Sequence, residues 1–187
     1  LALAVECDSM AGRCVTYLQS PVGGSRPTLG LVASIASLIG TPGDGMITSL
    51  ATGPAVRSGL LRIGQGGPIP ERAVWLSDAM AACLAGASPY WPGLAELNAP
   101  PNANWPASLV SAIEPVARGL VELPETLLVL RSVSRADRHE IGIRLAKASR
   151  KTAAVIALET VELEGLGPFI AAANLLPIFE IDIPPGE

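Results

Sequence analysis

The chain has little charge, few aromatic residues and almost no histidine. Charged residues make up 16% of its 187 residues and aromatic residues 4%, and His139 is the only histidine. The formal net charge is -4, so the chain has no basic surface with which to neutralise a nucleic-acid backbone, and we expect no nucleic-acid partner. A single histidine builds neither a metal site nor a catalytic triad with such neighbours. We therefore expect no bound metal and place His139 on the surface of a helix.

Cysteine and long apolar runs are scarce as well. The three cysteines, Cys7, Cys14 and Cys83, form no Cys-x-x-Cys pair and leave one over, which favours reduced, partly buried thiols in a cytosolic protein. No apolar run approaches the ~20 residues that a membrane-spanning helix needs, so we expect no direct membrane insertion. No basic signal segment is present, and a start at Leu1 fits a piece cut from a longer polypeptide.

What the chain has is hydrophobicity, at 49% of residues, in short segments separated by glycine and proline. This predicts one domain over residues 1–187. β-branched and alternating apolar runs predict strands, and longer apolar or amphipathic runs predict helices. The expected strands are residues 13–19, 46–51, 60–63, 94–97, 126–130, 152–158 and 178–183. The expected helices are residues 28–39, 71–84, 107–120, 135–150 and 167–176. Strands that alternate with helices predict an α/β fold with a mostly parallel sheet and helices on both faces.

The stretch "CVTYLQSPVGGSRPTLGLVASIASLIG", residues 14–40, has the layout of a phosphate-binding loop between a strand and a helix. Such a loop uses backbone N–H groups, close-approaching glycines and a lysine, with a Ser or Thr that holds magnesium. Gly23, Gly24 and Thr28 match this pattern. Pro27 stands where the lysine is expected and removes one N–H group. By local chemistry the stretch is either an altered nucleotide site or an ordinary turn between a strand and a helix.

Four segments in order resemble the Min/Par type of P-loop ATPases, and most closely the cytoplasmic domain of bacterial tyrosine kinases and exopolysaccharide chain-length regulators. They are "QSPVGGSRPT", "IGQGGPIPERAVWLSDAMAACL", "PGLAELNAPP" and "TLLVLRSVSRADRHEIGIRLAKASRKTAAVIALETVE". The resemblance runs from about residue 13 to residue 162 and implies a P-loop three-layer sandwich. It places Asn98 at the aspartate of the Walker B motif. The candidate nucleotide-binding positions that it implies are Gly23, Gly24, Ser25, Arg26 and Thr28.

The departures from this family fall on charged positions. Pro27 replaces the lysine, Arg26 replaces the preceding glycine, and Asn98 replaces the Walker B carboxylate. Each lost charged contact in a desolvated site removes ~3 kcal/mol, about a hundredfold. Phosphoryl transfer depends on such charges, so the resemblance implies a catalytically inactive pseudo-ATPase or pseudo-tyrosine-kinase with no expected cofactor. ATP and magnesium would bind only if Arg26, Thr28 and a dimer partner supplied a non-standard site.

Three functions remain open. The main expectation is a cytoplasmic domain, associated with the membrane through a partner, that regulates exopolysaccharide biosynthesis and export. Its partner would be a membrane chain-length regulator, a homologous ATPase or a second copy of itself, and Trp91 and Trp105 in proline-rich loops are candidate contacts. The alternatives are a nucleotide-binding enzyme with a non-standard loop, and a positioning factor for an envelope machine such as pili. The "GQGGP" stretch, residues 64–68, is a further turn between a strand and a helix.

Overall fold

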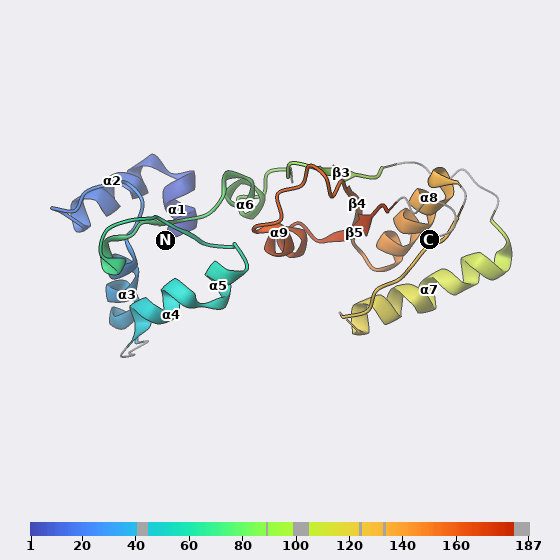
Figure 1. The fold of residues 1–187 in the computed structure, drawn as a ribbon, viewed down its shortest axis with the longest axis horizontal. Helices are drawn as coiled ribbons and strands as arrows, with labels where there is room; N and C mark the ends of the chain where they lie inside the picture. Colours follow the sequence, from blue (N-terminus) through green and yellow to red (C-terminus); the bar gives the residue numbers. More distant parts are fainter. Residues whose placement is uncertain (41–44, 89, 99–104, 124, 133, 182–187) are drawn as a thin grey trace. The chain divides into compact units, whose positions relative to one another are not determined.

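The chain divides into two units of helices and short strands (Figure 1). The computed structural model describes residues 1–40, 45–88, 90–98, 105–123, 125–132 and 134–181. Unit 1 comprises Leu1–Tyr90 and Glu162–Ala172, and unit 2 comprises Trp91–Val161 and Ala173–Glu187. The chain is thus mixed α/β, as its sequence predicts. A single domain over residues 1–187 stays a prediction, because one domain can contain two such units.

Unit 1 is mostly helical. Its elements are α1 (Ala2–Cys7), α2 (Ser9–Leu18), α3 (Leu29–Leu38), α4 (Met46–Thr52), α5 (Pro54–Arg57), β1 (Arg62–Ile63), η1 (Ile69–Glu71), β2 (Val74–Trp75), α6 (Asp78–Leu84) and α9 (Leu166–Ala172). β1 and β2 form an antiparallel pair in which Arg62 lies opposite Trp75. The buried side chains come from segments far apart in sequence, among them Val15, Met80 and Phe169. This burial of apolar surface is the main source of the unit's stability.

Helix α3 follows the glycine-containing loop of residues 19–28, and its position agrees with the predicted helix over residues 28–39. The Thr28 side chain caps its first turn by accepting a hydrogen bond from the Leu31 N–H. Leu29 and Ala33, four residues apart, are buried on one face of the helix. Capping and burial together fix the direction in which the helix leaves the loop.

Unit 2 contains a three-stranded sheet in the order β3-β4-β5. Its elements are β3 (Leu94–Glu96), α7 (Ala107–Glu122), α8 (Arg135–Ala148), β4 (Thr152–Ile156) and β5 (Leu175–Phe179). β4 pairs with β5 in parallel and with β3 antiparallel. Helix α8 packs on α7, β4 and β5, and Gly142 on α8 leaves room for the Ile178 side chain. The predictions for residues 94–97, 107–120, 135–150 and 152–158 agree with these elements to within a few residues.

The prediction of a mostly parallel sheet is wrong for the described strands, because only one of their three pairings is parallel. The described strands form one small mixed sheet and one antiparallel pair.

The strand predicted over residues 13–19 is wrong, because residues 13–18 belong to helix α2 and Gln19 is its C-cap. Asp8 starts the helix by accepting a hydrogen bond from the Met10 N–H at 2.8 Å. The buried residues Gly12, Val15 and Gln19 lie three and four positions apart, which is the spacing of one helical face. The alternation of β-branched and aromatic residues favoured a strand, but a helix is what places these three buried residues on the same face.

The strand predicted over residues 46–51 is wrong as well, since they form α4. The half-buried residues Met46, Ile47, Leu50 and Ala51 follow helical spacing. Thr52 donates its hydroxyl to the Thr48 carbonyl at 2.9 Å, which satisfies a polar group within the helix.

The buried strand predicted over residues 126–130 is wrong too. Among the described residues this segment pairs with no strand, and Leu127 and Val129 are 80% and 66% exposed. A hydrophobic run becomes a strand only when its backbone groups pair with a neighbouring strand, and these residues have no such pairing.

Two predicted helices are shorter than expected. The first, over residues 71–84, begins only at Asp78, where the Ser77 side chain accepts from the Met80 N–H, and β2 takes residues 74–75. The second, over residues 167–176, ends at Ala172 because β5 begins at Leu175. The predicted strand over residues 178–183 therefore starts three residues earlier, and its last two residues lie outside the described chain.

Candidate functional site

The glycine loop, residues 19–28, joins α2 to α3. Gly23 and Gly24 both have left-handed backbone conformations, with φ of 77° and 88°. L side chains rarely adopt this region, so the turn depends on glycine at both positions. The sequence pattern therefore has a structural basis that is independent of any phosphate.

The side-chain amide of Gln19 fills the inside of this loop. Its Nε2 lies 2.7 Å from the carbonyl oxygen of Gly23 and 2.8 Å from that of Gly24. The Arg26 carbonyl oxygen is 2.9 Å from the same nitrogen, so its two N–H groups are shared by three acceptors. Its Oε1 accepts a hydrogen bond from the Thr28 N–H at 3.1 Å, and the residue is only 8% exposed. One side chain thus holds both ends of the loop together.

Several N–H groups that a phosphate loop would direct at its anion donate within the chain. The N–H groups of Val22 and Gly23 donate to the Gln19 carbonyl at 2.9 and 3.4 Å. At the start of α3, the Leu29 N–H donates to the Arg72 carbonyl at 3.0 Å and the Leu31 N–H to the Thr28 hydroxyl. These internal bonds remove donors from the cradle that anion binding at a helix N-terminus requires.

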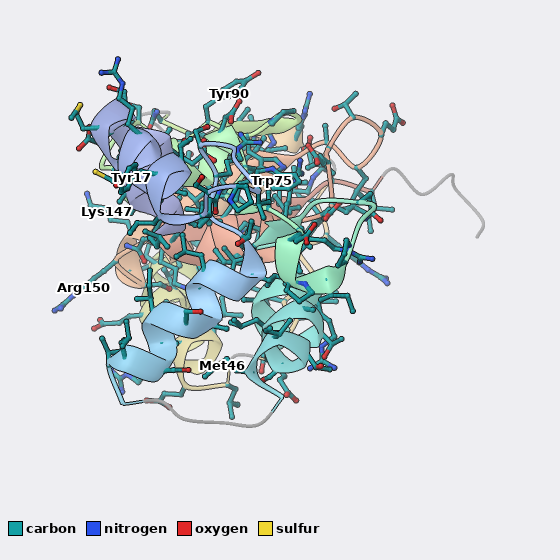
Figure 2. The ribbon with its side chains drawn as sticks, turned by 90° about the vertical axis from the view of Figure 1, so that its left-hand side faces the viewer. Tyr17, Met46, Trp75, Tyr90, Lys147 and Arg150 are labelled. Atoms are coloured by element: carbon teal, nitrogen blue, oxygen red, sulfur yellow. The ribbon has the colours of Figure 1, made fainter. Side chains whose placement is uncertain are left out.

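The charge on Arg26 is also used within unit 1. Its Nε lies 2.9 Å from Oε1 of Glu6 on α1. Its guanidinium carbon lies 5.0 Å from the ring centroid of Trp75 on β2, within cation–π range. Figure 2 labels Trp75 among the side chains of the unit. Arg26 thus ties the loop to α1 and β2.

The end of the loop is hydrogen-bonded to residues 72–74. The Val74 N–H donates to the Pro27 carbonyl at 2.7 Å, and Thr28 forms an isolated antiparallel bridge with Ala73. Pro27 is among the fully buried side chains, and Thr28 is 7% exposed. The hydroxyl expected to hold magnesium instead caps α3 from a buried position.

The candidate loop residues therefore come together, but around Gln19. The carbonyl groups of Gly23, Gly24 and Arg26 point toward its amide. Ser25 is exposed and lies close to α2, since a Cβ added to Gly12 would be 3.4 Å from the Ser25 Cβ. Sequence reasoning missed Gln19, although its position on the same helical face as Gly12 could have indicated it.

The other candidates belong to unit 2. Asn98 is exposed, two residues beyond the end of β3. Trp91 is 2% exposed and belongs to the buried hydrophobic side chains, and its role as a partner contact stays a prediction. Trp105 is half-buried, and its Nε1 is enclosed without a hydrogen-bond acceptor among the described residues. Of the two tryptophans, Trp105 is the more exposed.

Titratable groups elsewhere have mostly local roles. Cys7 and Cys14 are exposed, whereas Cys83 is half-buried, and burial raises the pKa of the Cys83 thiol. His139 lies on α8, and its Nε2 is 2.8 Å from Oε1 of Glu180. A hydrogen bond from Arg135, followed by one from His139, lowers the pKa of Glu180 despite opposing desolvation.

Comparison with family models, with curated proteins and with solved structures finds no match to this chain. In the part of the chain that the structure describes, no helix has the length and apolar character to cross a bilayer. The same residues contain no group of three or more His, Cys, Asp or Glu side chains able to hold a metal ion.

Proposed function

We propose that this chain is a non-catalytic domain of the P-loop ATPase type, in which the phosphate-binding loop has become a structural joint. The observation that carries the proposal is the Gln19 amide, which bonds to three loop carbonyls and to the Thr28 N–H. A phosphate bound in this loop would have to displace that side chain from a buried position. The Glu6 carboxylate beside Arg26 would also compete with an incoming anion.

The finer fold that belongs to this proposal is the P-loop three-layer sandwich. It requires residues 13–19 to run as a strand into the loop, whereas residues 13–18 are helical in α2. An experimental structure of the chain with its partner tests this part, and retention of α2 there would remove it from the proposal.

The proposed role is that of a cytoplasmic partner or regulator in exopolysaccharide biosynthesis and export. Support for it comes from the four sequence segments that resemble bacterial tyrosine kinases and chain-length regulators. Trp105 is the proposed contact residue, since it is only half-buried and a large aromatic side chain of this kind often anchors a protein partner. In a two-hybrid or co-purification assay, we expect a chain-length regulator to be retained and a pilus protein not to be. Trp105→Ala should weaken that capture, whereas Tyr90→Ala, at an exposed aromatic residue, should not.

The nucleotide part of the proposal is tested by isothermal titration with ATP and magnesium. We expect no binding up to millimolar ATP, because the loop donors and the Arg26 charge are already engaged within the chain. Micromolar binding that Arg26→Ala abolishes, and that Arg57→Ala at an exposed arginine leaves intact, would instead favour the nucleotide-binding enzyme.

A further inference from the structure

Unit 1 contains a pocket of about 520 Å³ that none of the proposed roles uses. Helices α3 and α5 contribute Leu29 and Val56 to its wall, and β1 contributes Arg62 and Ile63. Arg72, which follows η1, and Trp75 on β2 also line the pocket. Its volume is within the range of small-molecule sites, which are mostly apolar with a few polar groups.

The apolar part of the pocket suits a flat or branched hydrocarbon body. Leu29 and Ile63 supply aliphatic surface, and Trp75 supplies an aromatic ring. The ring is held in place, because β2 pairs with β1 and because Arg26 lies over it. Removing a ligand's apolar surface from water against this wall is favourable.

The charged residues of the pocket wall are two arginines and one carboxylate, Arg62, Arg72 and Glu164. The Arg72 guanidinium makes one hydrogen bond among the described residues, from Nε to the Gly67 carbonyl at 3.3 Å, and pairs with no carboxylate there. Its backbone is anchored, since its carbonyl accepts the Leu29 N–H. The arginine fork is therefore positioned and able to form further hydrogen bonds, and guanidinium geometry suits carboxylate and phosphate.

Arg62 is a second guanidinium in the pocket wall, and its charge is offset by an ion pair. It pairs through Nη2 with Glu162, while its Nε is enclosed and has no acceptor among the described residues. Glu164 is the carboxylate that lines the pocket, and its side chain lies beside Gly59, which precedes β1 in the chain. Arg72 is instead held by Gly67, which follows β1. Among the described residues, no ion pair joins Glu164 to Arg72.

We propose that this pocket binds a small organic anion, with a carboxylate or phosphate group on Arg72 and an apolar body against Trp75 and the aliphatic wall. This inference does not rest on the glycine-loop proposal. It assigns a ligand-binding role to the "GQGGP" segment, whose Gly67 carbonyl orients Arg72.

The test uses the full chain with phenylacetate, phenyl phosphate and the neutral 2-phenylethanol as probes, titrated by calorimetry and by tryptophan fluorescence. We expect saturable binding of at least one of the two anions and at least tenfold weaker binding of the alcohol. The anion that binds more tightly identifies the head group. Equal binding of all three probes, or binding of none at millimolar concentration, would overturn the proposal.

Three variants locate the site. Arg72→Gln should weaken anion binding about tenfold or more, since a charged hydrogen bond is lost, whereas Arg13→Gln at an exposed position on α2 should not change it. Glu164→Gln should leave binding unchanged or tighten it. A loss in Glu164→Gln as large as that in Arg72→Gln would refute the anion assignment. Unchanged circular dichroism and Tm show that each variant remains folded.

Two further measurements show whether the ligand contacts Trp75 and whether any ATP binding belongs to this pocket. Quenching of tryptophan emission by the bound anion should disappear in Trp75→Phe, and persistence of the full quench would contradict contact with this ring. ATP is itself an organic anion, so Arg72→Gln is also titrated with ATP. ATP binding that Arg72→Gln removes belongs to this pocket, whereas ATP binding that it leaves unchanged belongs elsewhere and counts against the glycine-loop proposal alone.

Discussion

Replacing Gln19 with alanine tests the closure of the glycine loop directly. The change removes the acceptor of the buried Thr28 N–H, and a buried unsatisfied donor costs about 1–3 kcal/mol. It also removes the amide donor that three loop carbonyls share. Water can reach the exposed Gly24 and replaces part of that loss. Together these changes predict that the free energy of unfolding falls by about 3 kcal/mol.

For a chain of this length, each kcal/mol shifts Tm by about 2–4 °C, so Gln19→Ala should lower Tm by about 6–12 °C. Differential scanning calorimetry measures the shift, and hydrogen exchange at the Thr28 amide should become much faster. Gln65→Ala is the matched control, because Gln65 is exposed and its truncation should change stability by no more than about 0.5 kcal/mol. Equal Tm values for the two variants, with Thr28 still protected, would refute the closed-loop argument.

Two further predictions concern unit 2 and pH. Gly93→Ala should destabilise the chain more than Gly86→Ala: both glycines have positive φ, but a Cβ on Gly93 would lie 2.7 Å from the Val161 backbone, whereas one on Gly86 meets nothing within 4 Å. Urea unfolding compares them, and equal midpoints would contradict the predicted clash. The lowered pKa of Glu180 means that its contribution to stability is present above the ordinary carboxyl pKa and is lost as pH falls through its folded pKa. The Tm difference between wild type and Glu180→Gln should therefore be full near neutral pH and vanish in acid, and a difference independent of pH would contradict the ion pair with Arg135.

Sequence patterns predicted the elements whose local and tertiary signals agree. Helix α3 follows a capping threonine and is apolar nearly throughout, and α8 begins with Ser134 accepting from the Asp137 N–H. β4 is short, apolar and central in its sheet. In each case propensity, end signals and burial favour the same structure, so the prediction needed no knowledge of the neighbours.

The site was predicted only in part, because the motif gave no role to Gln19, although this residue opens the segment "QSPVGGSRPT". The glycines and Thr28 mark a turn before a helix, and the structure places a turn there. The turn closes on Gln19 only because α2 is a helix. The helix places Gln19 on the same buried face as Val15. The strand predicted over residues 13–19 would have directed alternate side chains to opposite faces instead.

The sequence by itself determined the low charge, the turn glycines and the capped apolar helix that follows them, because these depend on residue type and near neighbours. Tertiary structure alone decided which hydrophobic segments found a partner. β4 became a central strand between β3 and β5, whereas the equally apolar residues 126–129 are exposed and pair with no described strand, because strand formation requires hydrogen-bond partners that only the folded chain provides. The use of Gln19, Arg26 and Arg72 was decided in the same way, because a polar side chain takes its role from the groups that folding brings within reach.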